Sequence, residues 1–459
     1  MKAVVFEAPF TVSVKQVSDP RDESLVEGSD EAIVQVEFAG LCGSDLHAFR
    51  GNELLPGGGR ITLGHEFVGR VIAHALPRNT ENGSNNDSVT NTNAATSLVG
   101  RTVLAPFTTS CLRCTPCEKG FTSRCVSSAL FGGSEKLQGA QAEFVRVPNA
   151  SGTLIDIETL SNKNSVASKL TFSKESLLLC CDILPTGYYA ALQALTHQNL
   201  HGVFRGISLT DYAWNPVAMP DASLLTPKDS LIRSPLTFAV VGLGPVGTCA
   251  LIALIDILLH PRDSPLRIPT PSLVLDRDLT FLLIDGVARR RDLAVKIFDR
   301  IKKTCNSNAS GASFFKNAKV VALDVDQAAV WTKSRKLDEC VDAALEAVGS
   351  SESLKLCYHI LRPFGVISSI GVHTSPTFPL TGDDLYNKNV ALNFGRCPVR
   401  AVLPLALKTL ERRQDVFETF ASTDPDGIGL IDRVVPVEDA AEMYDAFEKR
   451  KVGKVLFKF

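Results

Sequence analysis

Residues 237–247 read Thr237-Phe238-Ala239-Val240-Val241-Gly242-Leu243-Gly244-Pro245-Val246-Gly247, and they decide the fold of the second half of the chain. The first five residues are suited to a buried strand, and an apolar helical run begins at Thr248. Glycines spaced G-x-G-x-x-G between a strand and a helix permit a tight turn and let the backbone approach a pyrophosphate on the helix N-terminus. The pattern predicts a Rossmann unit whose cofactor contacts include Gly242, Gly244, Pro245, Val246 and Gly247.

The acid expected to bind the adenosine ribose is Asp285, which ends the apolar stretch Phe281–Ile284. Such an acid normally follows the glycines by about 20 residues. Asp285 lies 38 residues (285 − 247) after Gly247, and the Pro-rich residues 260–278 account for the difference. A carboxylate there repels a 2′-phosphate and favours NAD. Arg290, in the run Arg289-Arg290-Arg291, is a further candidate contact, and it keeps NADP open as the less favoured alternative.

Around this unit the sequence changes character along the chain. From about Ile183, strand-like apolar stretches alternate with helix-like segments, which is typical of a doubly wound parallel sheet. The stretches are Phe238–Val241, Phe281–Ile284, Val320–Leu323, Val341–Leu345 and Val366–Ile370. The earlier part has short strands broken by Gly and Pro, which favours an all-β, barrel-like domain. These strands are Lys2–Phe6, Ala32–Phe38, Phe67–Ala73 and Phe144–Val147.

Four polar or Pro-rich stretches interrupt this order, and we interpret them as surface loop insertions. They are residues 77–99, 203–234, 260–278 and 304–318. After residue 396 the chain has a helix-like segment, Leu403–Arg413, and a final strand-like segment, Lys454–Phe459, which is expected to return to the first domain.

Composition excludes several classes of function. The 48 Lys and Arg against 50 Asp and Glu give a formal charge of -2, which provides no electrostatic basis for binding nucleic acid or an anionic membrane. The apolar start, Met1–Phe6, lacks the pattern of a signal peptide, so we expect a cytoplasmic protein with no membrane partner.

Four of the 12 cysteines fall within fifteen residues, as Cys111-x2-Cys114-x2-Cys117-x7-Cys125. In a reducing compartment such a cluster indicates a metal rather than disulfides. Zinc takes four ligands in a tetrahedron, and close spacing lets a turning backbone direct several sulfurs to one point. Four thiolates leave no open position, so the predicted site is structural.

Two further segments carry metal-ligand types between glycines: Gly40-Leu41-Cys42-Gly43-Ser44-Asp45-Leu46-His47 and Gly64-His65-Glu66-Phe67-Val68-Gly69. Together with the four cysteines and the Gly-rich loop, they resemble the zinc-containing medium-chain dehydrogenase/reductases, the alcohol dehydrogenase family. The resemblance implies an α/β protein with three parts: a GroES-like β-barrel catalytic domain at 1–182, a Rossmann NAD(P)-binding domain at 183–395, and a return to the catalytic domain at 396–459.

The resemblance also implies two zinc ions per chain, one of them catalytic and held by Cys42, His65 and a third residue. In the better-known branch the third ligand is a Cys four residues before Thr-Gly-Tyr. Here that position holds Asp182, in Cys181-Asp182-Ile183-Leu184-Pro185-Thr186-Gly187-Tyr188. This form resembles the branch of the glutathione-independent formaldehyde dehydrogenases, in which Asp takes the place of Cys. Cys181 remains the alternative ligand. A carboxylate is a weaker donor than a thiolate, so the metal should be more Lewis acidic.

The implied reaction is oxidation of a zinc-bound alkoxide, with hydride passing to NAD(P). Ser44 resembles the family hydroxyl that takes the alcohol proton, and His47 the family His that passes it to solvent. Glu66 is expected beside the metal as an occasional ligand or a neighbour of the ligands. Downstream, the segments containing Val348, Gly371 and Val372 resemble those that close over the nicotinamide half.

Two alternatives come from other classes of function. A catalytically inactive nucleotide-binding relative, acting as a binding or regulatory protein, would be expected to lack Cys42, His65 or the glycines, and all are present. A nucleic-acid-binding zinc module would need a more basic neighbourhood than this lobe has. The expected partners are a small alcohol or aldehyde substrate and further copies of the chain, as a dimer or tetramer. Aldehyde dismutation, polyol oxidation and simple alcohol oxidation all stay open.

Overall fold

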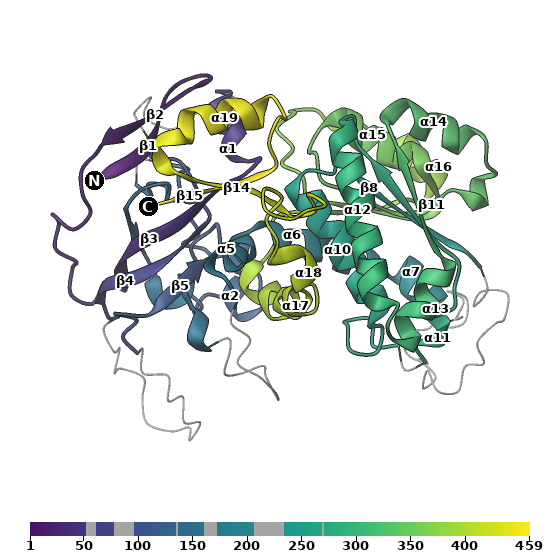
Figure 1. Ribbon diagram of the computed structural model, residues 1–459, viewed down its shortest axis with the longest axis horizontal. Helices are drawn as coiled ribbons and strands as arrows, with labels where there is room; N and C mark the ends of the chain where they lie inside the picture. Colours follow the sequence, from purple (N-terminus) through teal and green to yellow (C-terminus); the bar gives the residue numbers. More distant parts are fainter. Residues whose placement is uncertain (52–60, 78–95, 135, 160–171, 206–233, 269) are drawn as a thin grey trace.

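A computed structural model describes residues 1–51, 61–77, 96–134, 136–159, 172–205, 234–268 and 270–459. Two main sheets lie at opposite ends of the molecule, with helices between them (Figure 1). Strands of the early part and of the extreme C-terminus share the first sheet, and strands of the middle of the chain form the second.

The second sheet has six parallel strands, and each predicted apolar stretch falls on one of them. Their order is β10 (Ala318–Leu323), β9 (Leu279–Ile284), β8 (Leu236–Val241), β11 (Val341–Glu346), β12 (Leu361–Ser369) and β13 (Ala391–Phe394). From β8 the chain proceeds outward on one side to β10 and then resumes at β11 on the other. The strand order therefore reverses between β8 and β11, which is where open α/β sheets bind ligands.

Helices cover both faces of this sheet. One face packs against α6 (Ile183–Leu195), α10 (Pro245–Leu259), α12 (Ala288–Cys305) and α13 (Ala309–Asn317). The other face packs against α14 (Val325–Lys333) and α15 (Ser351–Ile360). Helix α10 is apolar and buried nearly all round, as expected of a helix that lies between the sheet and other helices. The doubly wound arrangement predicted from the sequence is confirmed.

The first sheet joins strands from both ends of the chain, in the order β14 (Ile431–Pro436), β15 (Lys454–Lys458), β3 (Glu31–Leu41), β4 (Phe67–Ala75), β5 (Thr102–Ala105) and β7 (Ile155–Asp156). Strand β6 (Phe144–Val147) also pairs with β3, and β1 (Lys2–Ala8) pairs with β2 (Thr11–Gln16). Strand β15 lies antiparallel to β3, with Leu456 opposite Gly40. The C-terminal strands thus lie among N-terminal ones (Figure 1), and the start of β15 lies next to the end of β3, just before Cys42.

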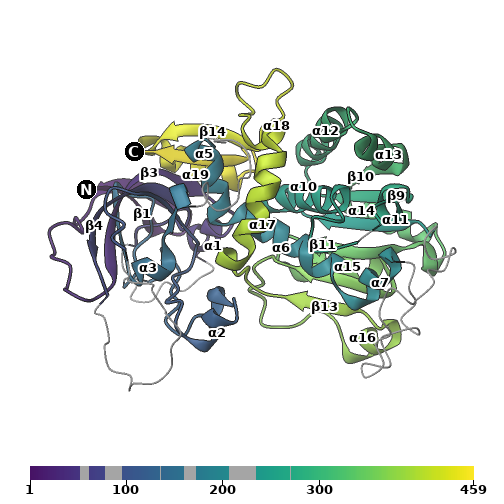
Figure 2. The ribbon, with the colours of Figure 1, turned by 90° about the horizontal axis from the view of Figure 1, so that it is seen from below.

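Helix α17 (Val399–Arg412) lies between the two halves, as the view from below shows (Figure 2). It is held to α10 by Asp256, a fully buried carboxylate that accepts hydrogen bonds from Thr409 and Arg412. A buried charge is costly unless it is paired and hydrogen-bonded. This contact therefore fixes how the C-terminal segment packs on the half of the molecule that contains the parallel sheet.

Two of the four stretches that we interpreted as surface loops contain helical turns and buried side chains. Residues 304–318 contain α13, whose Phe314 and Phe315 are buried against α12 and β9. Residues 260–278 contain the short helix α11 (Ser272–Leu275) and bury Leu266 and Ile268. The prediction was wrong because composition was averaged over each stretch, whereas a few apolar side chains decide burial. Most of the other two stretches, 78–95 and 206–233, lies outside the described residues.

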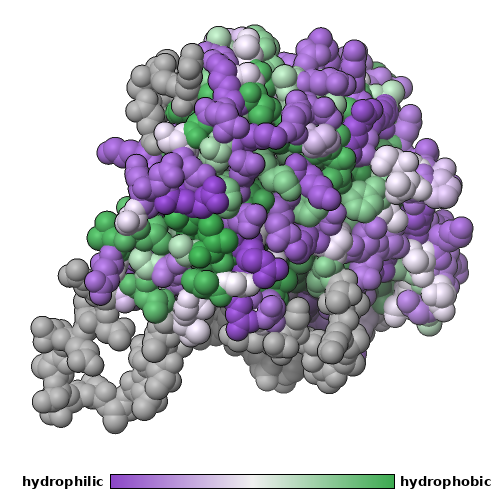
Figure 3. Space-filling model, turned by 60° about the vertical axis from the view of Figure 1, so that its left-hand side comes forward, coloured by the Kyte–Doolittle hydropathy of each residue, from purple (hydrophilic) through white to green (hydrophobic). Residues whose placement is uncertain are grey.

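Within the described part of the chain, no single helix is long and apolar enough to cross a membrane. One bent pair, Lys174–Cys181 with Ile183–Leu195, passes by length and composition alone, and its second helix packs in the core described above. The space-filling view of the N-terminal half shows hydrophilic residues interspersed with smaller hydrophobic areas (Figure 3).

Candidate active site and zinc sites

Cys42, His65 and Asp182 converge at the inner end of the first sheet. Cys42 directly follows β3, His65 precedes β4, and Asp182 lies between a short 3-10 turn and α6. The Asp182 Oδ2 atom is 3.5 Å from the Cys42 sulfur and 3.5 Å from His65 Nε2. Ligands about 2.0 to 2.3 Å from a tetrahedral zinc would lie about 3.3 to 3.8 Å apart. The three donors therefore have the spacing of a zinc site with an open fourth position.

Neighbouring side chains fix the orientation of two of these donors. His65 Nδ1 lies 3.1 Å from Asp45 Oδ1, and the Asp45 carboxylate also accepts the Cys42 N–H at 2.9 Å. This contact assigns the proton to Nδ1 and leaves Nε2 directed at Cys42 and Asp182. Thr186 donates to Asp182 Oδ1 at 2.7 Å, which leaves Oδ2 directed at the other two donors. Carboxylate and hydroxyl partners of this kind commonly orient metal ligands.

Cys181, the alternative third ligand, is directed away from the cluster. Its sulfur donates to the carbonyl of Phe67 at 3.2 Å, and burial raises the pKa of its thiol to about 12. Cys181 is not part of the group of side chains that could hold a metal, whereas Asp182 is.

The remaining predicted catalytic residues lie around the three donors. Ser44 Oγ is 3.4 Å from the Cys42 sulfur and 3.2 Å from His65 Nε2. His47 lies on α1 (Asp45–Phe49), one helical turn from Ser44, to which its backbone is hydrogen-bonded. Glu66 is fully buried and forms an ion pair with Lys454 of β15, which also donates to the carbonyl of Leu41.

The charges at this site favour a bound cation. Burial, together with Glu66 and Asp182, raises the pKa of the Cys42 thiol. Burial opposes the charging of His65, but Asp45, Asp182 and Cys42 outweigh it and raise the His65 pKa. Among the described residues, Glu66 Oε1 is buried with no hydrogen-bond partner. Unpaired buried carboxylate oxygens are costly, so the residues fit a divalent metal at this position.

The four clustered cysteines also converge. Their sulfurs lie within 4.8 Å of one another, with Cys125 3.5 Å from Cys111 and 3.8 Å from Cys114. Disulfide sulfurs lie about 2.05 Å apart, whereas thiolates 2.3 Å from a tetrahedral zinc lie about 3.8 Å apart. The amides of Val126 and Cys117 lower the pKa of Cys114 to about 6, and burial raises that of Cys117 to about 12. These residues fit a closed zinc site.

The predicted cofactor residues line the carboxyl edge of the parallel sheet where the strand order reverses. Gly242 has φ +90°, and a side chain at Gly247 would lie 1.7 Å from the Gly242 carbonyl oxygen, so glycine is required there. Pro245 begins α10, and Val246 follows it. Val348, which follows β11, leans over Gly242, and Gly371 packs directly on Gly349. Val348 and Val372 remain 49% and 42% exposed, leaving apolar surface at this edge.

Asp285 lies at the end of β9 with its carboxylate facing the Gly-rich loop. Its two oxygens accept the N–H groups of Leu243 and Val287, each at 2.7 Å, and Arg290 Nη1 lies 3.7 Å away. Each carboxylate oxygen has a further lone pair for a ribose hydroxyl. The position predicted from strand context is therefore beside the glycines in space.

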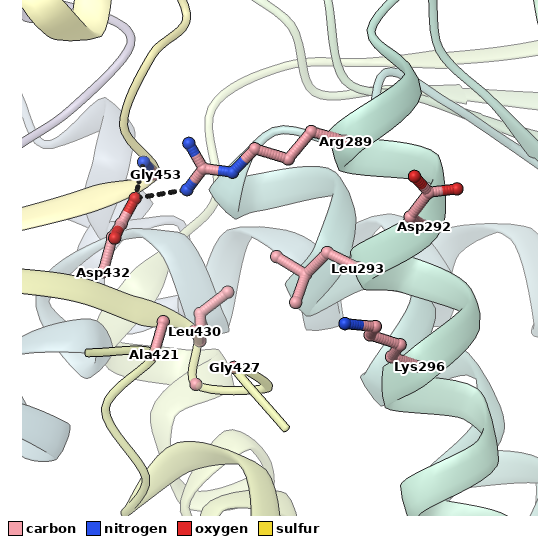
Figure 4. A pocket seen from close by; sticks show the side chains of 10 residues that line it. Arg289, Asp292, Leu293, Lys296, Ala421, Gly427, Leu430, Asp432 and Gly453 are labelled. Carbon is pink, nitrogen blue, oxygen red and sulfur yellow. Dashed lines mark hydrogen bonds and ion pairs between the residues drawn. The ribbon is translucent and has the colours of Figure 1, made fainter. Parts of the chain in front are cut away.

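A cavity of about 320 Å³ lies elsewhere, between α12 and the segment that leads into β14 and β15 (Figure 4). Arg289 crosses it to donate to Asp432, which also accepts the Gly453 N–H. None of the predicted catalytic or metal-ligating residues lines this cavity. Arg289 thus contacts the C-terminal segment, while its neighbour Arg290 approaches Asp285.

Sequence reasoning gave no role to three residues of this site. Asp45 was quoted within its motif. Its position three residues after Cys42 was the signal that could have identified it. Thr186 was quoted only as a landmark for Asp182. Lys454 lies 388 residues from Glu66, and only the pairing of β15 with β3 brings them together.

Comparison with known proteins agrees with this arrangement. Residues 28–158 match the family described as alcohol dehydrogenase GroES-like domain. The chain is 33% identical over 458 residues to zinc-type alcohol dehydrogenase B of Aspergillus flavus, covering 100% of the chain and 81% of that protein. It is 32% identical over 386 residues to the medium chain reductase/dehydrogenase ucsI of an Acremonium species, covering 84% of the chain and 98% of that protein. The chain belongs to the zinc-type medium-chain alcohol dehydrogenases and is an oxidoreductase of that family.

Solved structures support the fold. Alcohol dehydrogenase TADH from Thermus sp. ATN1 superposes with a TM-score of 0.65 at 24% identity, over 100% of both chains. The predicted GroES-like and Rossmann fold class is thereby confirmed. Glutathione-independent formaldehyde dehydrogenase of Pseudomonas aeruginosa is 31% identical over 206 residues, which is 42% of this chain and 45% of that protein. Similarity to that branch is therefore partial.

Proposed function

We propose that this chain is an NAD-linked alcohol dehydrogenase with a catalytic zinc held by Cys42, His65 and Asp182. The observation that carries the proposal is the convergence of these three donors, with Asp182 Oδ2 3.5 Å from each of the other two and the Ser44 hydroxyl against Cys42 and His65. The three residues are spread from position 42 to position 182, and folding alone gives no reason for their side chains to meet. The proposal keeps the predicted division at residues 182 and 395, which separates the strands of the two sheets and leaves β14 and β15 in the last part.

Zinc, when bound, would act as a Lewis acid that lowers the pKa of an alcohol hydroxyl, and the nicotinamide would accept the hydride. Ser44 lies where it can accept the hydroxyl proton of such a substrate, because its oxygen contacts two of the donors. His47, one turn along α1, receives that proton and releases it to solvent. Asp45 and Thr186 hold the His65 ring and the Asp182 carboxylate in place during the reaction. The alcohol carbon loses a hydride and the oxygen a proton, so the product is a carbonyl compound.

The proposal is tested by incubating the purified protein with primary alcohols, secondary alcohols and polyols, each with NAD and with NADP. Formation of reduced cofactor, followed by absorbance, is the expected result, with NAD the better acceptor. Loss of activity after removal of zinc, and its return on adding zinc, would tie the reaction to the metal. A protein that binds zinc and NAD but oxidises none of these substrates would favour the catalytically inactive alternative.

Metal content is the first quantitative prediction. Elemental analysis of the purified protein should find about two zinc ions per chain, one for each cluster of converging donors. The closed four-thiolate site should release zinc to a chelator more slowly than the open site. A stoichiometry of one or none would remove at least one of the two proposed sites.

For the cofactor, Asp285→Ala should lower the preference for NAD over NADP by about ten-fold, the equivalent of about 1.4 kcal/mol. The carboxylate would no longer accept from a ribose hydroxyl or repel a 2′-phosphate. The measurement is the ratio of kcat/KM values for NAD and NADP, with zinc content unchanged. Asp292→Ala, an exposed change further along α12, is the matched control. An unaltered ratio in Asp285→Ala would mean that another residue sets the preference.

A further inference from the structure

The carboxylate of Glu346, at the end of β11, joins two loops. The proposed mechanism does not say what holds these two loops in place. Glu346 is fully buried. Its Oε1 accepts the N–H groups of Val348 at 2.9 Å and Gly349 at 2.7 Å, and the Ser353 hydroxyl at 2.7 Å. Its Oε2 accepts the Ser369 hydroxyl at 2.6 Å. A buried carboxylate of this kind is stable only with such a full set of donors.

His373 supplies the contact from the second of these loops, which follows β12. Its Nε2 lies 3.2 Å from Glu346 Oε2 and 2.9 Å from Ser369 Oγ. The carboxylate can only accept, and the single Ser369 proton is directed to it, so both partners of Nε2 are acceptors. Nε2 must therefore carry a proton. The ring also packs on Phe394 of β13, with centroids 5.4 Å apart.

The two loops joined in this way lie at the reversal of strand order. The first contains Val348, which leans over Gly242, and the second contains Gly371 and Val372. They pack without spare room: a side chain on Gly371 would lie 2.2 Å from the Gly349 nitrogen, and one on Gly349 would lie 2.4 Å from the Val372 carbonyl oxygen. A small displacement of one loop must therefore displace the other, because such close packing leaves no room for the loops to move independently.

Electrostatics strengthen the connection between the loops. Burial opposes the ionisation of Glu346, but hydrogen bonds from His373, Ser369 and the Gly349 amide outweigh it and lower the Glu346 pKa. The carboxylate is therefore charged at neutral pH, and hydrogen bonds to a charged acceptor are about twice as strong as neutral ones. Loss of the His373 N–H would leave Oε2 with one donor fewer in a buried position.

We propose that His373 is a positioning residue for the nicotinamide end of the cofactor, because it holds the loop after β12 to Glu346 and hence to the loop after β11. The inference rests on the proposed function, which places a nicotinamide at this edge. His373 acts through the backbone around Val348 and Val372 and does not exchange protons or hydride with the substrate.

The experiment compares His373→Leu with His373→Gln, whose side-chain amide restores an N–H near the position of Nε2. His373→Leu should raise the Kd for the reduced cofactor, measured by its fluorescence, and the cofactor KM by about ten-fold. Its kcat at saturating cofactor should stay within about two-fold, and its zinc content should not change. His373→Gln should recover most of the affinity. Ser369→Ala, a smaller change at the same carboxylate, should weaken binding in the same direction.

His359→Leu, at an exposed position on α15 of the same domain, is the matched control and should bind like the parent. Hydrogen exchange should show faster exchange of the Val348 and Gly349 amides in His373→Leu, since a purely local defect would leave them unchanged. If the parent binds cofactor and His373→Leu has the same cofactor affinity and the same amide exchange as the parent, this inference is overturned and the proposed function is not. A parent that binds neither NADH nor NADPH would overturn the proposed function, and this inference with it.

Discussion

Asp182→Ala is expected to lose one of two zinc ions and to lower turnover by more than about a hundred-fold. The carboxylate contributes Oδ2 to a site in which it lies 3.5 Å from both Cys42 and His65. Without it two protein donors remain, and catalytic zinc sites usually have three. Cys125 and its neighbours keep their own metal, so the loss should be of one ion. The measurements are metal content and steady-state turnover on the same preparation.

Two further variants separate the third ligand from its neighbour. Cys181→Ala should keep both metal ions, because the Cys181 sulfur is hydrogen-bonded to the Phe67 carbonyl rather than directed into the cluster. Asp182→Cys should retain zinc with altered activity, since a thiolate is a stronger zinc donor than a carboxylate. If Cys181→Ala lost the catalytic zinc while Asp182→Ala kept it, the site would be the commoner kind with two thiolates and one imidazole.

Thr186 is expected to affect the same site less strongly. Thr186→Val removes the hydroxyl that donates to Asp182 Oδ1 at 2.7 Å while keeping the shape of the side chain. Loss of such a supporting contact typically weakens metal binding by about ten- to a hundred-fold. The variant should therefore be purified with zinc but lose it to a chelator faster than the parent does.

Local patterns in the sequence predicted the local geometry of the segments that carry them. The G-x-G-x-x-G loop, the four cysteines and the spacing of Asp182 from Thr186 depend on few residues, and each segment has the geometry that its pattern requires. Strand context predicted that Asp285 lies beside the Gly-rich loop, because the sheet fixes where a strand ends whatever lies between strands. Residues 304–318 show where local patterns fail. The burial of Phe314 and Phe315 depends on a partner helix, which the local sequence does not indicate.

Contacts between distant segments could not be predicted in this way. The pairing of Glu66 with Lys454 depends on β15 lying beside β3, and nothing near either residue indicates it. The bond between His373 and Glu346 likewise depends on the register of β11 with β12. A single sequence identifies residues of the right chemical type, but which of them meet is decided by strand pairing across the chain.

The second large effect is expected in the four-cysteine lobe, where Cys125→Ser or Cys114→Ser should lower the melting temperature by at least about 5 °C. The buried hydrophobic cluster of this lobe consists of the cysteines themselves. Its larger apolar residues are exposed, with Phe121 at 56% and Val126 at 77%. A lobe with so small a core depends on the metal for its structure, because zinc binding at such a site is also folding free energy.

The effect should extend beyond the lobe, because the lobe contacts the helix that connects the two halves. Ser123 donates to the carbonyl of Arg396, just before α17, and Gly120 lies against Ala401 of that helix. Cys340→Ser is the matched control, since its sulfur donates to the Lys336 carbonyl and a hydroxyl can do the same. Each lobe variant should also lose one zinc ion while Cys42 and His65 keep theirs. Variants that retain both metals and melt with the parent would show that the four sulfurs converge for packing alone.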